Sequence, residues 1–284
     1  MDSRAWGLTF SGSWRDDRGM AMRAKTARPG NYAEEARTYD LTRGGSPTVV
    51  RLVSKFLGPQ AGRSVVDIAG GTGNYARVFQ ARGFEVVVLD AEPAMVARSV
   101  PKIGPGRQVV GEASALPFGD DAFDAALLIH AVHLIRDPSS ALRELRRVIR
   151  RGPLVLIDPV RENVATFVQE YFGLRPASDA RPRRGDIERL LEGSGFGRVE
   201  HERILYSDTA DGSLYALHVN ALHLAGPAYL RNTTFWYQLD PETRQRGLKA
   251  LAAALRSGEL AVRVKEHFSA AVERGHETAF AAWP

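Results

Sequence analysis

The chain has 284 residues, of which 44% are hydrophobic and 25% are charged, and its formal net charge is +5. These values are typical of a globular protein with one large domain or one domain carrying an insertion. The absence of cysteine excludes disulfides, thiolate zinc sites and cysteine nucleophiles. No apolar run approaches the roughly 18 residues that cross a membrane, so we expect a cytoplasmic protein with no membrane partner.

Residues 1–30 are polar and aperiodic, which predicts a flexible tail without the apolar core of a secretory signal. Helical patterns over 32–40 and 46–57 predict a pair of N-terminal helices within residues 31–60. Gly44-Gly45 lies between these helices and predicts a hinge. The segment 31–60 would then act as a flap.

Strands and helices alternate in the next part of the chain. We expect strands at 64–68, 84–89, 108–110, 123–129, 153–157 and 197–207, and helices at 75–82, 93–99, 138–148 and 186–193. Residues 211–257 are largely helical in pattern, and Ala261–Val272 is expected to return as the last strand. This rhythm predicts a doubly wound α/β fold with a mostly parallel, seven-stranded sheet. Residues 61–208 and 259–284 would form a cofactor-binding core, with residues 209–258 as a helical cap over its ligand edge.

The first expected strand runs into a glycine-rich loop that indicates a binding site. Asp67 is followed by glycines at positions 70, 71 and 73, and Asp90 ends the next strand, 17 residues after Gly73. Glycines allow a sharp turn and a close approach of ligand to backbone, and Asp90 is placed to accept hydrogen bonds from ribose hydroxyls. A carboxylate ahead of the glycines would repel a pyrophosphate but would favour an ammonium group, which argues against a dinucleotide.

Four motifs in order resemble one family. Residues 67–73 (Asp-Ile-Ala-Gly-Gly-Thr-Gly) resemble motif I of the class I S-adenosylmethionine-dependent methyltransferases, with Ala69 in place of the usual first glycine. Residues 111–118 with 121–124 resemble the G-D-A-x-x-L-P-F…D-x-F-D signature of the ubiquinone/menaquinone-type small-molecule methyltransferases. Residues 90–95 are similar to that family's D-x-S-x-x-M segment, and residues 39–43 to its Y-D-x-x-R element. The resemblance covers about residues 36–205.

The resemblance implies S-adenosylmethionine as methyl donor and S-adenosylhomocysteine as product. It implies that Glu112 binds the adenine amino group, that Ala113 and Met95 lie against the ring, that Tyr39 covers the methionine end and that Arg43 pairs with its carboxylate. The alternative for Arg43 is a solvated side chain at a helix end. The expected cofactor-binding residues are Tyr39, Arg43, Asp67, Ala69, Gly70, Gly71, Gly73, Asp90, Ala91, Met95, Glu112, Ala113 and Ile129.

Methyl transfer requires alignment of the reactants, exclusion of water and often removal of a proton. His130 and His133 follow the fourth expected strand, and histidine titrates in the useful range. His133 stands where relatives have a histidine beside the cofactor, although either residue could be a satisfied structural histidine. A zinc pair would need further ligands that the sequence does not place, so no metal is expected.

The expected cap contributes candidates for contact with an acceptor. Tyr215, His218 and Trp236 are aromatic residues within it, and His218 is also a candidate catalytic group. The alternative is that they build the hydrophobic interior of the cap. Tyr39 and His133 complete the expected acceptor-binding residues.

The leading hypothesis is methyl transfer to a carbon, nitrogen or oxygen nucleophile of a small molecule. The 33 arginines against 5 lysines are typical of GC-rich bacterial genomes and associate the chain with natural-product biosynthesis. The alternatives are a non-methylating cyclase or scaffold that binds S-adenosylmethionine, and an RNA methyltransferase. Arginines 143, 146, 147, 150 and 151 lie near a helix end and suit its dipole, so we expect no nucleic-acid partner; a homodimer stays open.

Overall fold

The computed structural model describes residues 14–15, 21–22, 32–59, 62–174 and 181–284. Most of the predicted flexible tail, 1–30, lies outside the described residues. Its two described pieces, β1 (Trp14–Arg15) and β2 (Ala21–Met22), pair as antiparallel strands. In the described part of the chain, no helix is both long and apolar enough to cross a membrane.

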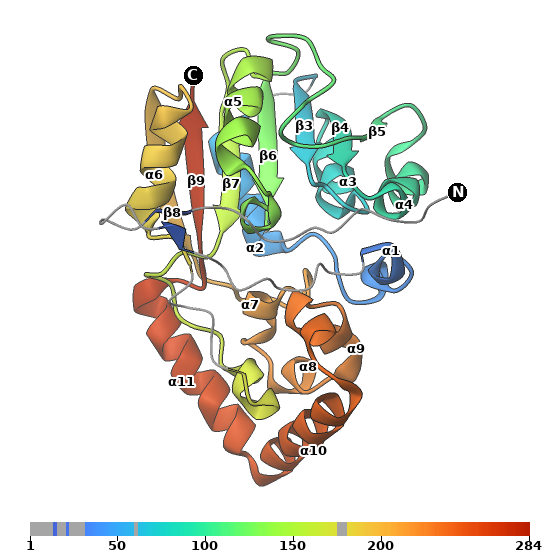
Figure 1. Ribbon diagram of the computed structural model, residues 1–284, viewed down its shortest axis with the longest axis vertical. Coiled ribbons are helices and arrows are strands. Elements are labelled where there is room, and N and C mark those ends of the chain that lie inside the picture. The colour runs from blue at the N-terminus through green and yellow to red at the C-terminus, as the bar shows by residue number, and fades with distance from the viewer. Residues whose placement is uncertain (1–13, 16–20, 23–31, 60–61, 175–180) are drawn as a thin grey trace.

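The core is a single sheet of seven strands in the order β5-β4-β3-β6-β7-β9-β8 (Figure 1). Five strands are parallel: β3 (Ser64–Ile68), β4 (Glu85–Asp90), β5 (Gln108–Val110), β6 (Ala125–Ile129) and β7 (Leu154–Asp158). The last strand, β9 (Glu277–Trp283), lies antiparallel between β7 and β8 (Arg198–Ile204). The predicted fold, a mostly parallel seven-stranded α/β sheet, is confirmed.

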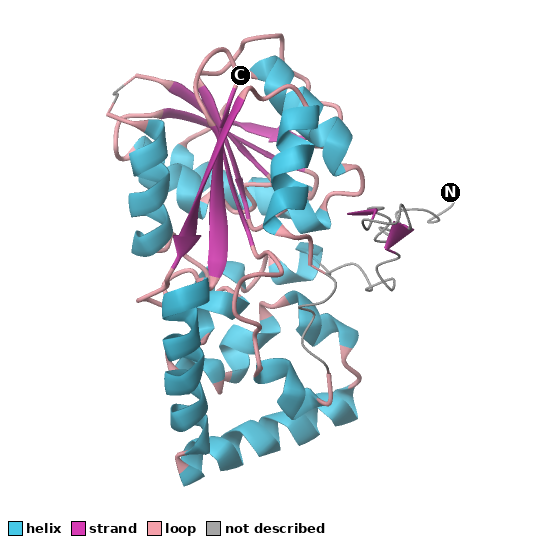
Figure 2. Cartoon of the chain, turned by 90° about the vertical axis from the view of Figure 1, so that its left-hand side faces the viewer, coloured by secondary structure: helices cyan, strands magenta, loops and turns pink. Residues whose placement is uncertain are grey.

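Helices cover both faces of the twisted sheet (Figure 2). Val65 belongs to a buried cluster with residues of α2 (Pro47–Leu57) and α3 (Asn74–Gln80), whereas its neighbour Val66 belongs to another cluster with residues of α5 (Pro138–Val148) and α6 (Arg184–Gly193). Successive residues of a strand point to opposite faces, so two separate hydrophobic layers result. The remaining sheet helix, α4 (Pro93–Ile103), follows β4. Because strands β3 to β7 are parallel, their carboxyl ends share one edge of the sheet.

A helical cap faces that edge (Figure 1). It follows β8 and contains α7 (Leu214–Leu217), α8 (Ala221–Leu224), α9 (Pro227–Arg231), the 3-10 helix η5 (Thr234–Gln238), α10 (Pro241–Ser257) and α11 (Glu259–Arg274). A further 3-10 helix, η3 (Val168–Phe172), reaches the cap from the loop after β7. Phe167, Phe172, Leu230 and Leu251 belong to one buried cluster in the cap.

The predicted strand at Ala261–Val272 is wrong, because these residues lie within α11. Leu260, Val264, His267 and Ala271 recur three or four residues apart and give that helix its packing face. The last strand begins only at Glu277, after Gly275 ends the helix with a φ of +75°. The insertion before the last strand is therefore longer than predicted, and α11 packs with the cap.

The N-terminal flap is docked between core and cap. It consists of α1 (Tyr32–Glu35), the 3-10 helix η1 (Tyr39–Leu41) and the chain leading into α2. The cap residue Asn232 donates a hydrogen bond to the carbonyl of Thr38 at 3.2 Å. A Cβ at Gly212, which has a φ of +62°, would lie 2.0 Å from the carbonyl oxygen of Thr42. Close backbone contact between cap and flap thus depends on glycine at position 212.

We predict that Gly212→Ala separates cap and flap and destabilises the protein. The left-handed backbone alone costs a non-glycine residue on the order of 1–3 kcal/mol, and the clash with Thr42 adds to this. Urea unfolding of the variant and the wild type measures the loss. Gly193→Ala is the control, because Gly193 lies in α6 with nothing within 4 Å of its added Cβ; its stability should be unchanged or slightly higher. Equal stability of Gly212→Ala and wild type would contradict the prediction.

Candidate functional site at the carboxyl edge of the sheet

The glycine loop after β3 has the geometry of a ligand-binding turn. Gly71 has a φ of +55° and donates its N–H to Asp90 Oδ2 at 2.9 Å, and Gly73, with a φ of +75°, begins α3. A Cβ at Gly70 would approach the Asp67 carboxyl to 2.8 Å. Ala69 itself has a φ of 54°, a conformation that favours glycine. The residue that departs from the family pattern therefore occupies a position where glycine would be less strained.

Two carboxylates lie beside this loop at the ends of adjacent strands. Asp67 is only 2% exposed, and its Oδ2 atom has no hydrogen-bond partner among the described residues. Burial, reinforced by the charge of Asp90, raises the pKa of Asp67 to about 7. Asp90 accepts N–H groups from Gly71 and, at 2.9 Å, from Glu92. An unpartnered buried carboxylate of this kind is stabilised by a cationic or hydrogen-bond-donating ligand group.

The residues expected around an adenine ring follow β4, β5 and β6. Met95 is buried on α4, whereas Ala91 and Glu112 are exposed in the loops after β4 and β5. Ala113 is half-buried and Ile129 buried at the end of β6. No hydrogen bond or ion pair joins the Glu112 side chain to the described residues. The position after β5 is thus accessible to a ligand, as the resemblance requires.

Tyr39 and Arg43 of the flap lie together, with the Arg43 guanidinium 5.1 Å from the Tyr39 ring centroid. Arg43 Nη2 is 3.0 Å from Asp211 Oδ1 of the cap, and Nη1 donates to the Asn232 carbonyl at 3.3 Å. The side chain is 13% exposed, so the alternative of a solvated arginine is excluded. In this structure Arg43 pairs with a carboxylate of the cap, whereas the resemblance assigned it a carboxylate of the cofactor.

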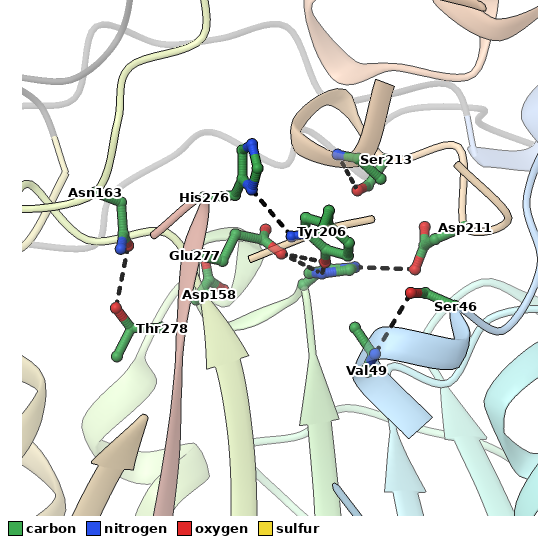
Figure 3. A network of polar contacts seen from close by, with 12 residues as sticks. Ser46, Val49, Asp158, Asn163, Tyr206, Asp211, Ser213, His276, Glu277 and Thr278 are labelled. Atoms are coloured by element: carbon green, nitrogen blue, oxygen red, sulfur yellow. Dashed lines mark hydrogen bonds and ion pairs between the residues drawn. The ribbon is translucent and has the colours of Figure 1, made fainter. Parts of the chain in front are cut away.

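His130 is the centre of a buried polar network that includes Tyr206, Asp211 and Glu277 (Figure 3). Its Nε2 lies 2.9 Å from Glu277 and its Nδ1 3.6 Å from Asp211, and its φ is 56°. Burial alone would lower the pKa of His130, but the charges of Glu277 and Asp211 outweigh it and raise the pKa to about 9. A histidine already protonated at neutral pH is poorly suited to accept a proton, which favours the structural reading of His130.

Two tyrosines complete this network. The Tyr206 hydroxyl donates to Glu277 and the Tyr75 hydroxyl donates to Asp211. Burial raises the pKa of both tyrosines well above 10, so they stay neutral donors. The residues Asp211, Tyr206 and Glu277 were not expected from the sequence, because they come from the cap, from the loop after β8 and from β9, and they meet only through the fold.

His133 has a different environment, in the 3-10 helix η2 (Val132–Leu134) after β6. Its Nδ1 lies 2.7 Å from Asp158 Oδ1, the side chain is 40% exposed, and Nε2 has no partner among the described residues. Burial would lower the pKa of His133, but the Asp158 carboxylate outweighs it and raises the pKa. Asp158 also escaped the sequence analysis, although it ends β7 just as Asp90 ends β4.

The structure corrects the predictions for His218 and Trp236 of the cap and leaves the prediction for Tyr215 untested. His218 is fully buried; its Nε2 accepts the Phe167 N–H at 3.0 Å and its Nδ1 donates to the Leu214 carbonyl at 2.6 Å. Trp236 is buried edge-on against Phe172. These contacts contradict the predicted catalytic and substrate-binding roles of His218 and the predicted acceptor contact of Trp236. Tyr215 instead packs against the core cluster, beside Arg181.

Known proteins resemble this chain in sequence. A family model described as a methyltransferase domain matches residues 66–157. A ubiquinone/menaquinone biosynthesis C-methyltransferase UbiE from Idiomarina loihiensis is 30% identical over 193 residues, which are 57% of this chain and 74% of that protein. A demethylmenaquinone methyltransferase from Renibacterium salmoninarum is 33% identical over 128 residues, 43% of this chain and 49% of that protein. The chain spans about half the length of this relative and of a similar UbiE from Paracoccus denitrificans, of which it covers 51%.

A solved structure also shares the fold. A putative methyltransferase from an antibiotic biosynthesis pathway of Anabaena variabilis superimposes with a TM-score of 0.74 at 21% identity. The match covers 86% of this chain and 99% of that chain. This likeness shows that the two chains share a fold over most of their lengths.

We predict that His130 and Glu277 stabilise the fold as a charged pair. His130→Gln should cost about 3–5 kcal/mol of unfolding free energy at pH 7, because it leaves Glu277 buried without its partner. The double variant with Glu277→Gln should recover most of that loss. Because the pKa of His130 in the fold is raised from 6.5 to about 9, the stabilisation is fully present below pH 6.5 and is lost as pH rises through about 9.

Urea unfolding of the double-mutant cycle at pH 6.5, 8 and 10 measures this coupling. His201→Gln is the control, because His201 pairs with Glu188 on the surface at 2.9 Å and such pairs contribute at most about 1 kcal/mol. A coupling energy between His130 and Glu277 that is equally small, or that does not change with pH, would contradict the prediction.

Proposed function

The chain belongs to the class I S-adenosylmethionine-dependent methyltransferases of the ubiquinone/menaquinone biosynthesis type, and from this premise we propose that it transfers the methyl group of S-adenosylmethionine to a small molecule. The observation that carries the proposal is the unpartnered, buried carboxylate of Asp67 beside a glycine loop, with Asp90 at the end of the next strand. These two carboxylates can accept hydrogen bonds from an amino-acid ammonium group and from ribose hydroxyls, both of which are present in that cofactor.

The residues of the carboxyl edge divide the cofactor among them in this proposal. Asp67 would face the ammonium group, Asp90 the ribose, and Met95 and Glu112 the adenine. The bound cofactor supplies a methyl group on a sulfonium, which needs no covalent help from the protein. The protein therefore has to bind, to orient, to exclude water and, for some acceptors, to hold a proton.

Arg43 gives the flap a role in this binding. A guanidinium can match a carboxylate with two parallel hydrogen bonds, and Arg43 pairs with the Asp211 carboxylate through Nη2 across the flap–cap contact. The carboxylate of the cofactor would compete with Asp211 for that fork or share it. We infer that binding of the cofactor rearranges the contact between Arg43 and the cap.

His133 is the group best placed to accept a proton from the acceptor. Its Nδ1–H points to the Asp158 carboxylate, which fixes the tautomer and leaves the Nε2 lone pair directed away from Asp158. Asp158 does not touch the reacting atoms in this scheme, so it is a positioning residue. His130 is excluded from this task by its charge, and His218 by its burial in the cap.

The acceptor is proposed to be a small organic molecule. The relatives carry names of quinone-biosynthesis methyltransferases, which supports a small-molecule acceptor for this chain. Natural-product biosynthesis is a finer proposal, supported by the GC-rich character of the composition and by the cap over the sheet edge. Methyl transfer from labelled cofactor to any acceptor separates this enzyme from a cyclase or scaffold that binds the same cofactor.

We predict that the wild-type protein binds S-adenosylmethionine and S-adenosylhomocysteine, and that Asp67→Asn and Asp90→Asn each weaken binding at least tenfold. Each variant loses a carboxylate that faces the ligand, which corresponds to about 1.4 kcal/mol or more. Titration calorimetry measures the two dissociation constants. Glu85→Gln is the control, because Glu85 is exposed at the opposite end of β4 from Asp90. Absence of binding by the wild type would refute the proposed function.

We predict that His133→Gln lowers the rate of methyl transfer by 10²–10⁴-fold, as expected for a lost general base, while S-adenosylhomocysteine binding is retained. The wild-type rate should rise with pH through the pKa of His133, because the neutral imidazole is the active form. Asp158→Asn removes the carboxylate that positions His133 and raises its pKa. The rate of methyl transfer by this variant should therefore fall, and the acidic limb of its pH–rate profile should move to lower pH. A pH–rate profile measures both effects, and an unshifted limb would contradict the role of Asp158.

A further inference from the structure

Arg181 is a buried cation without a counter-charge in the described part of the chain. Its side chain is 7% exposed, on the loop between β7 and α6. Its one hydrogen bond with a described residue runs from Nη1 to the Val164 carbonyl at 3.5 Å, which is a weak contact. Its guanidinium lies 5.1 Å from the centroid of the Tyr215 ring. A buried cation is costly unless a carboxylate or a set of good acceptors compensates it.

The position of Arg181 is on the acceptor side of the carboxyl edge. The Arg181 side chain contacts the carbonyl of Val164. The backbone N–H of Val164 in turn donates to the carbonyl of Gly275, two residues before β9. Burial raises the pKa of Tyr215, the positive charge of Arg181 lowers it, and the negative charges of Glu277 and Asp158 raise it. Tyr215 packs against the buried cluster that contains Ile129 at the end of β6 and Ile157 of β7, so Arg181 lies near the carboxyl ends of these two strands.

Three other basic side chains of this region have a carboxylate partner. Arg43 pairs with Asp211, His130 with Glu277 and His133 with Asp158. The buried cap histidines His218 and His267 provide no counter-charge for Arg181, because an imidazole is either neutral or cationic. Burial lowers the pKa of His218 and of His267, and Arg181 lowers that of His267 further, so both rings are neutral. Among the described residues, Arg181 thus stays without a counter-charge.

We propose that Arg181 binds an anionic group of the acceptor, a carboxylate or a phosphate, with Tyr215 holding the guanidinium plane. The inference rests on the proposed function, because the acceptor is the molecule that would lie between the cap and the ends of β6 and β7. A guanidinium offers a rigid fork that matches either anion. The acceptors would accordingly be small acids rather than neutral compounds.

A structural role for Arg181 makes a different prediction about stability. If the side chain were held only by its packing and its hydrogen bond, its removal would destabilise the protein. If it is an unpaired charge kept for a ligand, Arg181→Met should leave the thermal midpoint of the ligand-free protein unchanged or higher, because methionine removes a buried charge.

The experiment uses benzoate, phenyl phosphate and the neutral analogue benzamide as probes. Titration calorimetry and thermal unfolding of the full chain, with and without S-adenosylhomocysteine, measure their binding. We expect at least one of the two anions to bind at least tenfold more tightly than benzamide, and which one it is identifies carboxylate or phosphate as the preferred group. Arg181→Met should abolish this preference without lowering the midpoint. Arg181→Lys, which keeps the charge but not the fork, should weaken anion binding at least threefold.

Arg189→Met is the matched control, because Arg189 is an exposed arginine of α6 that pairs only with Asp186 on its own helix. It should bind the anions as the wild type does. Equal binding of benzamide and the anions, or unchanged anion binding in Arg181→Met and Arg181→Lys, would overturn the proposal. A lowered midpoint of both Arg181 variants with no change in selectivity would assign a structural role. Failure of S-adenosylhomocysteine to bind would instead refute the proposed function, because anion binding is also measured without it.

Discussion

The pairing of buried charges where flap, core and cap meet is the constraint on which the rest of this structure depends. Arg43 of the flap, Asp211 of the cap, His130 after β6 and Glu277 of β9 form a row of alternating sign. Each of these groups is buried, and a buried charge without its partner costs several kcal/mol. The flap and the cap can therefore leave the core only if their charges find other partners or water. This couples the three segments more specifically than their hydrophobic contacts do.

The topology of the sheet explains why these charges meet. Parallel strands place their carboxyl ends at one edge, so Asp67, Asp90 and Asp158, which lie at or near the ends of β3, β4 and β7, all lie toward the same edge of the sheet. The last strand runs in the opposite direction between β7 and β8. Its first residues, including Glu277, consequently begin at the edge where the others end. An antiparallel last strand delivers a carboxylate to His130 that a parallel strand would have placed at the far edge.

Local patterns were enough to predict most elements and the donor side of the site, but not the acceptor side. The loop from Asp67 to Gly73 is contiguous, so its turn and its carboxylate can be read from neighbouring residues. The contacts of His130 join residues up to 147 positions apart, and no local pattern specifies them. His218 was misjudged because a histidine in an aromatic segment looks the same whether it faces a ligand or bonds to the backbone of Phe167. The helix α11 was missed because its apolar content was weighed without its spacing of three and four residues.

Two uncompensated groups mark the two sides of the edge with opposite charge. Among the described residues, Asp67, on the donor side, is a buried carboxylate without a partner for one oxygen, and Arg181, on the acceptor side, is a buried guanidinium without a carboxylate. Stability alone favours pairing such groups, and in the proposed scheme it is the ligands that complete them. A methyl donor with an ammonium group and a sulfonium matches the negative side, and an acidic acceptor matches the positive side. The same charges would also oppose binding in the reverse orientation, since that would place the ammonium group beside Arg181 and the acid beside Asp67. Between them, the His130–Glu277 pair is neutral overall and favours neither orientation, whereas Arg43, in exchanging Asp211 for the carboxylate of the cofactor, would favour the same orientation as Asp67 and Arg181.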